Sequence, residues 1–472
     1  MAMSLTVTTE QAEAIEELLY DWLAETGAPG ASLVVVDETD KLFSTGVGAR
    51  DRSENRPATP ETLYGFASVT KSFTALAVLQ QVERGHLALD EPITESTDAA
   101  FEGADEVTLG ELLTHSSGVP SIGTSTVLIS RHGELGETGI PLSTPDDLLQ
   151  YLSDAGEQRD THSIGRFMYN NTAYYLLEFA VETVTGRSFT EYVTEEILRP
   201  LGMERSTFDP EKMKGDDNHA TPYKSGDDGF EPTKFPSSGV AFGAGGLISS
   251  PHEMGNYLQF NLTGEIPIGE GASDDEPLDG GKQLVDPKLI AKAHDAHIEP
   301  LPRYGDAYGY GWSQREVAGS TVIGHGGSLL TSSSAIGFLP SEGFGVALAS
   351  AGQPEIHPTD VLEGVVATLL GEDPTAIQPT LAYSDRVEAL TGEYTGYRDV
   401  VTATVTDEQG HLKLDMSMGP LAEELTLVPR DPTLSETVFE IPSPGRRTPV
   451  EFVETGTGYD LFYDRYRLHK TG

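Results

Sequence analysis

The chain has 472 residues, of which 38% are hydrophobic, and a formal charge of −45 from 75 acidic and 30 basic residues. It contains no cysteine, which excludes disulfides, thiolate metal sites and a cysteine nucleophile. Nucleic acid is not an expected partner, because phosphate binding needs a basic patch and we find none in the sequence.

The acidic excess is spread along the whole chain, which indicates a solvated surface rather than an interaction tail. Self-repulsion of this size destabilises a compact state in dilute salt, whereas molar salt shortens the Debye length to about 3 Å. We therefore hypothesise that the protein comes from a halophile. Melting it across a KCl series tests the hypothesis, and greatest stability in dilute salt would contradict it.

The N-terminal segment, residues 1–23, has no basic start followed by an apolar core. It predicts an amphipathic helix and no signal peptide. No apolar run in the sequence approaches the 18 residues of a membrane-spanning helix. The expected partners exclude a membrane, and the expected location is cytoplasmic.

The first half of the chain predicts strands followed by helices. Residues 31–51 predict two strands joined by a polar turn. A helix follows Ser68 and ends at Gly85 as its C-cap. Further along, the expected elements are a short helix running into a loop (107–123), a Gly/Ser/Thr-rich lid or binding loop (121–145), and two helical segments split at Gly186 (172–203).

The following residues predict a small antiparallel meander. Residues 263–286 are acidic, glycine-rich and aperiodic, and indicate a surface excursion. Three short apolar runs between 320 and 350 predict antiparallel strands, and 360–371 predicts a closing helix. Strands, helices and strands again in one unit indicate an α+β domain.

The pattern of apolar and polar residues changes after a proline-bearing linker at 372–384. Beyond it, about 90 residues alternate apolar and polar side chains between turns, which predicts a small all-β sandwich or barrel. The predicted domains are therefore 1–375 and 376–472.

Ser68 and Lys71 form an S-x-x-K motif at the start of a helix. Free backbone N–H groups and the helix dipole favour a developing anion at Ser68. Lys71 is one turn further on the same face, so its amine reaches the hydroxyl. Apolar neighbours indicate a buried helix, and a buried lysine has a lowered pKa and acts as a base or relay. The alternative is a serine that caps the helix.

Tyr169 and Asn171 form a second element, Y-x-N, directly before another predicted helix. A tyrosine near a lysine ammonium has a lowered pKa and works as a general base. An asparagine amide can hold the lysine and a substrate carbonyl together. The alternative is a buried aromatic beside an asparagine that caps the helix.

His325, Gly326 and Gly327 follow an apolar strand and form a third element. Two glycines on an edge strand allow a substrate backbone to approach closely. The N–H of Ser328 then joins the N–H of Ser68 as an oxyanion hole. The alternative is a simple turn at the end of the strand.

In this order and spacing, the three elements resemble the penicillin-recognising serine hydrolases: class C β-lactamases, DD-carboxypeptidase B, D-aminopeptidases and related esterases. Flanking stretches such as "LLTHSSGVP", "ILRPLGMERSTF" and "YGYGW" resemble the same family, over about residues 10–370. The resemblance implies a β-lactamase/transpeptidase-like fold, an antiparallel sheet flanked by helices with a helical subdomain. The C-terminal segment resembles the lipocalin-like barrel appended to some members.

The resemblance also implies a role for each residue. Ser68 is the nucleophile, Lys71 assists its deprotonation, and Tyr169 is the general base and then the acid. Asn171 positions substrate and lysine, and the third motif is His325, Gly326 and Gly327. The implied function is acyl-enzyme hydrolysis, without a cofactor, of short peptides that include D-residues. The alternatives are an esterase or β-lactamase of the same fold, and a catalytically silent binding protein. Assembly into a homo-oligomer is a further possibility that the sequence does not decide.

One departure from the family concerns His325, where members that recognise a substrate carboxylate usually carry lysine. Histidine is mostly neutral near pH 7.5, so carboxylate anchoring weakens. This favours an aminopeptidase or an esterase over a β-lactamase or DD-carboxypeptidase.

Other polar clusters predict no metal or nucleotide site. His294 and His297 share a helical face, but two ligands make no zinc site. The acid runs lack calcium-loop spacing, and the glycine-rich stretch 243–246 has no phosphate-loop lysine. His115 and Ser117 are expected to support loop structure.

Overall fold

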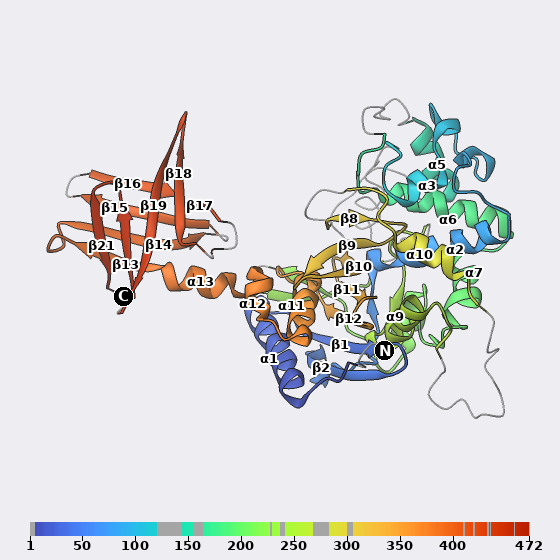
Figure 1. Ribbon diagram of the computed structural model, residues 1–472, viewed down its shortest axis with the longest axis horizontal. Coiled ribbons are helices and arrows are strands. Elements are labelled where there is room, and N and C mark those ends of the chain that lie inside the picture. The colour runs from blue at the N-terminus through green and yellow to red at the C-terminus, as the bar shows by residue number, and fades with distance from the viewer. Residues whose placement is uncertain are drawn as a thin grey trace. The chain divides into compact units, whose positions relative to one another are not determined.

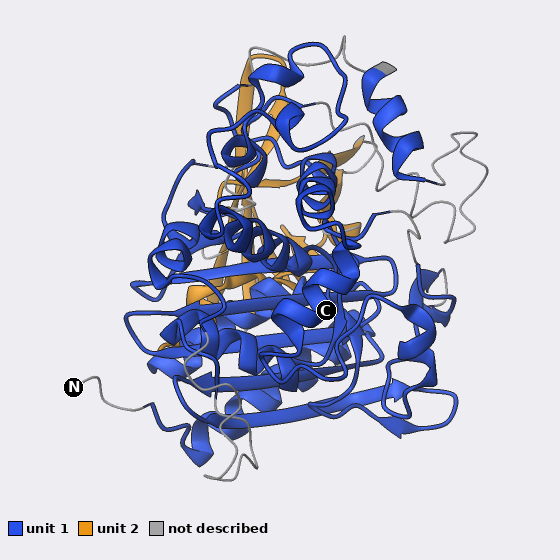
Figure 2. Ribbon diagram, turned by 90° about the vertical axis from the view of Figure 1, so that its right-hand side faces the viewer, with its two compact units in different colours: residues 1–371 blue, residues 372–472 orange. Residues whose placement is uncertain are grey.

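The chain forms two compact units, Met1–Gly371 and Glu372–Gly472 (Figure 2). Residues 121–143 of the predicted lid or binding loop lie outside the described residues. Residues 268–282 of the predicted surface excursion also lie outside them. The computed structural model describes residues 5–119, 144–154, 164–226, 229–236, 241–267, 283–299, 305–408, 411–418, 421–431, 434, 436–456 and 458–471.

The described part of the first unit contains an eight-stranded sheet, in the order β3-β2-β1-β12-β11-β10-β9-β8 (Figure 1). All neighbouring strands run antiparallel, which confirms the predicted meander. The strands are β1 (Gly30–Asp37), β2 (Lys41–Asp51), β3 (Arg56–Pro57), β8 (Ala307–Tyr308), β9 (Ser313–Val317), β10 (Ser320–Leu329), β11 (Ser332–Leu339) and β12 (Phe344–Ala351).

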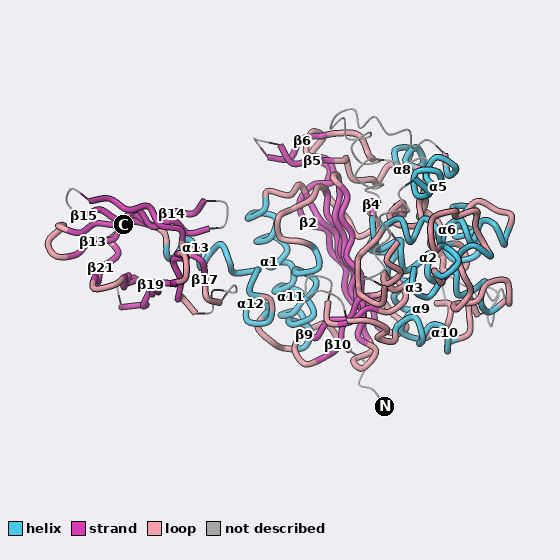
Figure 3. The backbone as a smooth tube through the Cα atoms, turned by 90° about the horizontal axis from the view of Figure 1, so that it is seen from above, coloured by secondary structure: helices cyan, strands magenta, loops and turns pink. Residues whose placement is uncertain are grey.

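Helices cover both faces of this sheet. On one face α1 (Thr9–Thr26) and α11 (Pro358–Leu370) pack against the strands, and on the other face lies α9 (Pro251–Thr263) (Figure 3). Strands β1, β11 and β12 are consequently buried at every position. This explains why their sequences are apolar runs without alternation.

The remaining helices form the helical part of the unit. Gly85, predicted as a C-cap, directly follows the C-cap Arg84 and ends the preceding helix with a left-handed φ of 72°. The predicted split at Gly186 is confirmed, because Gly186 caps a helix in the same conformation. The helices are α2 (Thr70–Glu83), α3 (Leu109–Leu113), α5 (Pro145–Asp154), α6 (Asn171–Thr185), α7 (Phe189–Val193), α8 (Pro210–Gly215) and α10 (Pro287–His294).

The second unit is a small barrel. Its described residues form nine antiparallel strands in the order β16-β15-β14-β13-β21-β20-β19-β18-β17, and β16 contacts β18, so the barrel is nearly closed. The predicted linker is instead helical, with α12 (Pro374–Ile377), a 3-10 turn (Pro379–Ala382) and α13 (Tyr383–Leu390). The strands are β13 (Gly392–Gly396), β14 (Val401–Glu408), β15 (His411–Met418), β16 (Leu421–Thr426), β17 (Val428–Pro429), β18 (Val438–Ser443), β19 (Arg446–Thr455), β20 (Gly458–Tyr463) and β21 (Tyr466–Lys470).

The predicted N-terminal amphipathic helix is confirmed as α1, in which Ile15, Leu19 and Trp22 are buried. Within the described residues, none of the helices has the length and hydropathy of a membrane span.

The exposed side of α1 predicts a strong salt dependence of stability. Glu13, Glu17, Asp21 and Glu25 are exposed at successive i,i+4 positions, and the helix contains no basic residue. Like charges at this spacing destabilise a helix by about 0.2–0.5 kcal/mol per pair. We expect the melting temperature to rise between about 0.1 M and 1 M KCl, as the Debye length falls from about 10 Å to 3 Å.

The matched variant is Glu17→Lys, which converts two repulsive pairs into attractive ones. It should gain about 1 kcal/mol in dilute salt and show a shallower salt slope than wild type. Calorimetry in a KCl series measures both. A melting temperature that falls towards molar KCl would contradict the expectation.

Candidate active site

Ser68 lies on a short 3-10 turn (Ala67–Val69) that leads into α2. The turn has a left-handed residue, Ala67, with a φ of 49°, a conformation that costs a non-glycine residue energy. Hydrogen bonds hold the turn from both sides: Ser334 Oγ donates to Phe66 O (2.9 Å), and Thr70 Oγ1 donates to Ala67 O (2.6 Å). The interpretation of Ser68 as a helix cap is wrong, since its side chain makes no capping bond.

Lys71 is fully buried, and its amine is surrounded by three oxygens. Its Nζ donates to Asn171 Oδ1 (2.7 Å) and to Ala244 O (2.7 Å), and lies 3.1 Å from Ser68 Oγ. A carbonyl oxygen can only accept, so these two contacts use both hydrogens of a neutral amine. The lone pair of that amine then faces the Ser68 hydroxyl, which is the arrangement a proton acceptor needs.

Burial favours this neutral form. It lowers the pKa of Lys71 well below the usual lysine range, because the charged form loses its water. The geometry and the electrostatics therefore agree on a lysine that can take a proton from Ser68.

Glu178, which the sequence reasoning missed, holds the loop that carries Ala244. Its carboxyl group lies on α6, two turns after Asn171, and its Oε2 accepts from the N–H groups of Phe242 (2.8 Å) and Gly243 (2.7 Å). Burial raises the pKa of Glu178 to about 8. Only its apolar surroundings, "YYLLEFAV", distinguished this acid in the sequence.

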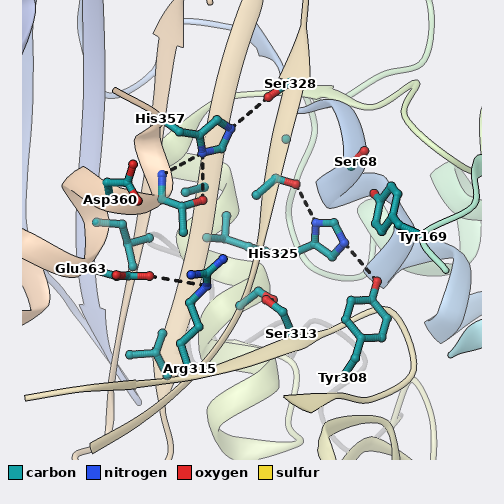
Figure 4. A pocket seen from close by; sticks show the side chains of 18 residues that line it. Ser68, Tyr169, Tyr308, Ser313, Arg315, His325, Ser328, His357, Asp360 and Glu363 are labelled. Carbon is teal, nitrogen blue, oxygen red and sulfur yellow. Dashed lines mark hydrogen bonds and ion pairs between the residues drawn. The ribbon is translucent and has the colours of Figure 1, made fainter. Parts of the chain in front are cut away.

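Tyr169 and Asn171 lie beside the lysine, as the resemblance implied. The Tyr169 ring centroid is 4.7 Å from Lys71 Nζ, and its side chain lies next to Ser68 in the lining of the pocket (Figure 4). Asn171 is the first residue of α6, whereas the N-cap is Asn170, whose Oδ1 accepts from Thr172 N (2.9 Å). The asparagine that caps this helix is therefore Asn170, which leaves the Asn171 side chain to contact Lys71.

The glycines of the third motif are required by close packing within the protein. A Cβ on Gly327 would lie 2.1 Å from Phe66 O, in the Ser68 turn, and one on Gly326 would lie 2.7 Å from Thr359 Oγ1 on α11. Strand β9 pairs with β10 only as far as Gly324. Among the described strands, residues 325–329 therefore form an edge of the sheet beside Ser68.

A pocket of about 610 Å³ opens beside Ser68, and Tyr169 and His325 also line it. Ser328 is exposed in it, and its hydroxyl lies 3.0 Å from His357 Nε2. On the other side of β10, Arg315 forms an ion pair with Glu363 at 3.5 Å (Figure 4).

His325 lies at the centre of the pocket wall but is only 7% exposed. Its Nδ1 is 2.6 Å from Gly326 O, and its Nε2 is 3.1 Å from the hydroxyl of Tyr308. Burial, with Lys71 nearby, lowers the pKa of His325 to about 3. Tyr308 was visible in the sequence only as part of the quoted "YGYGW" stretch.

The histidines weighed as metal ligands have other contacts. His294 Nε2 lies 2.9 Å from Asn261 Oδ1, and His297 stacks on Tyr310 with ring centroids 4.1 Å apart. Within the described residues, we find no group of three metal-ligating side chains.

The fold and this site define a protein of the serine hydrolase class built on a β-lactamase-type domain. Residues 12–368 match the family model "Beta-lactamase", so the chain belongs to the β-lactamase family and the resemblance is confirmed. Residues 374–469 match the model "Pab87 octamerisation domain".

Three relatives illustrate the family membership. The octameric penicillin-binding protein homologue from Pyrococcus abyssi is 30% identical, with a TM-score of 0.83 over 97% of this chain and 99% of that chain. D-amino acid amidase from Ochrobactrum anthropi SV3 is 25% identical, with a TM-score of 0.62 over 77% of this chain and 98% of that one. Protein flp from Staphylococcus aureus (strain MW2) is 29% identical over 207 residues, 43% of this chain; the match spans 39% of that relative's length.

Proposed function

We propose that the protein hydrolyses short peptides or amino acid amides, including those with D-residues, through an acyl-enzyme on Ser68. The observation that carries the proposal is the buried Lys71 amine, whose two N–H groups are bound by Asn171 and Ala244. Its lone pair is thereby aimed at Ser68 Oγ, 3.1 Å away. The similarity to D-amino acid amidase supports the substrate class.

In this mechanism Ser68 Oγ attacks the substrate carbonyl while its proton passes to the Lys71–Tyr169 pair. The N–H groups of Ser68 and Ser328 hold the oxyanion. The carbon–nitrogen bond then breaks, and Tyr169 returns the proton to the departing amine. A water molecule then attacks the ester carbonyl and gives its proton to the same pair. The bond to Ser68 Oγ breaks, Ser68 takes the proton back, and the acid is released.

Two side chains near the pocket support a preference for amides and N-terminal residues. His325 is held neutral, and Arg315 is paired with Glu363 on the other side of β10. Neither supplies the fixed charge that a substrate carboxylate needs. This supports an aminopeptidase or amidase, with an esterase as the second candidate because esters need the same nucleophile and no charged anchor.

The experiment that tests the function is intact-mass analysis after mixing with an activated acyl ester of an amino acid in molar KCl. We expect one acyl mass on wild type and none on Ser68→Ala. The absence of an adduct on folded wild type would overturn the acyl-enzyme mechanism and favour a binding protein on a hydrolase fold. A panel of L- and D-amino acid amides then identifies the preferred stereochemistry.

We also propose that the protein assembles as a homo-oligomer through residues 374–469, which match the octamerisation model. The octameric relative from Pyrococcus abyssi supports this. Light scattering of the full chain measures the assembly, and the mass of a single chain would contradict it.

A further inference from the structure

A chain of hydrogen bonds joins the segment before α6 to strand β10. Asn170 N donates to His115 Nδ1 (3.1 Å), and His115 Nε2 lies 3.4 Å from Tyr308 Oη. Tyr308 Oη lies 3.1 Å from His325 Nε2, and His325 Nδ1 lies 2.6 Å from Gly326 O (Figure 4). This series of hydrogen bonds therefore begins at a backbone N–H and ends at a backbone carbonyl.

These two ends fix the proton of each neutral imidazole ring. A backbone N–H can only donate, so His115 Nδ1 is a lone pair and the proton of this ring is on Nε2. A backbone carbonyl can only accept, so the proton of a neutral His325 is on Nδ1. His115 therefore presents Nε2–H to the Tyr308 oxygen, and His325 presents the lone pair of Nε2 to the Tyr308 hydroxyl. The same hydroxyl also contacts Tyr174, whose own O–H donates to Leu113 O (2.7 Å).

The surroundings keep both rings neutral. His115 and Tyr308 are each 1% exposed, and His325 is 7% exposed. Burial, together with the nearby Lys71, lowers the pKa of both histidines. An imidazolium at His115 is also excluded by geometry, because it would set an N–H against the N–H of Asn170.

The residues at the two ends belong to the catalytic motifs. Asn170 stands between Tyr169 and Asn171, and Gly326 is flanked by His325 and Gly327. Tyr169 and Asn171 lie at the start of α6, whereas His325 and Gly327 lie on β10 beyond its pairing with β9. The Tyr308 hydroxyl contacts both histidines and so links these motifs, beside the Tyr169 ring, whose centroid lies 4.4 Å from that of His115 and 6.2 Å from that of His325.

We propose that Tyr308 is a positioning residue of the active site, which holds His325 as its Nδ1–H tautomer and fixes β10 against the segment of Tyr169 and Asn171. The inference rests on the proposed function. It adds that both ring nitrogens of His325 are engaged by the protein, so the substrate meets the backbone of the third motif and not a hydrogen bond from the ring.

The test compares Tyr308→Phe with Tyr310→Phe. The second variant removes a hydroxyl two residues away that takes no part in the hydrogen-bond series. We expect Tyr308→Phe to slow acylation of Ser68 by about 10- to 100-fold, mainly in kcat, as intact mass measures with the activated ester. A hydrogen bond to the neutral form of His325 is lost, so the pKa of His325 should rise, as NMR titration of the imidazole measures. Tyr310→Phe should keep the wild-type rate and the wild-type titration of His325.

A second readout does not require activity. The unfolding free energies of Tyr308→Phe, His325→Gln and the double variant form a cycle. We expect the double variant to lose less than the sum of the single losses. Additive losses, or an unchanged titration of His325 in a Tyr308→Phe protein that acylates normally, would overturn the role of Tyr308 and leave the proposed function intact. Wild type without an adduct overturns the proposed function, and the cycle still decides the hydrogen-bond chain.

Discussion

Lys71→Met is expected to slow acylation of Ser68 by about 10³-fold, within the range of a lost general base. The methionine keeps the length and apolar character of the side chain but has no lone pair to receive the Ser68 proton. Asn171 Oδ1 and Ala244 O also lose their donor, so the loop that ends at Ala244 is less firmly held. Intact-mass kinetics with the activated ester measures the rate.

The pH dependence gives a second criterion. Burial lowers the pKa of Lys71, so the folded protein binds fewer protons here than the unfolded chain does at neutral pH. The lysine therefore costs stability below the unfolded lysine pKa, and this cost disappears as the pH rises to that value. Acylation by wild type should rise with pH through the lowered pKa, and Lys71→Met should lack this limb.

The control is Lys41→Met, which removes a lysine with a side-chain hydrogen bond far from the site, to His252 Nε2 at 3.0 Å. It should acylate at the wild-type rate. If Lys71→Met is folded and also keeps that rate, Lys71 does not accept the proton of Ser68.

The contact between Ser68 and Lys71 is predictable from the sequence because it is local. Ser68 and Lys71 are three residues apart, so helical geometry alone brings the amine to the hydroxyl. The two glycines after His325 were also recognisable, and the structure adds a packing reason for them. Gly327 is required by Phe66 O of the Ser68 turn, a contact between segments more than 250 residues apart in sequence.

The supporting groups depend on such distant contacts and were not predictable. Glu178 has the sequence of an ordinary acid on an apolar helix, and its role appears only where the loop at 242–243 packs against it. Tyr308 similarly gains its role from His115 and His325, which lie on other elements. Spacing within one helix or strand carries no signal for partners that tertiary packing selects.

His325→Lys should convert the neutral wall of the pocket into a carboxylate anchor. A hydrogen bond to a charged partner contributes about 1.5–3 kcal/mol, so we expect the preference for peptides with a free C-terminal carboxylate over their amides to rise by about 10- to 100-fold. The absolute rates should fall, because Tyr308 loses its acceptor and the Gly326 carbonyl loses a donor. The preference is therefore expressed as a ratio of kcat/KM values.

His325→Gln is the matched control, since it disturbs the same contacts without adding a charge. It should lower both rates and leave the ratio near that of wild type. The lysine also brings a second cation close to Lys71, which lowers the pKa of Lys71 further because like charges disfavour ionisation. The basic form of Lys71 then persists to lower pH, so the acid limb of the rate should move down in His325→Lys alone. An unchanged ratio in His325→Lys would show that carboxylate recognition depends on other residues.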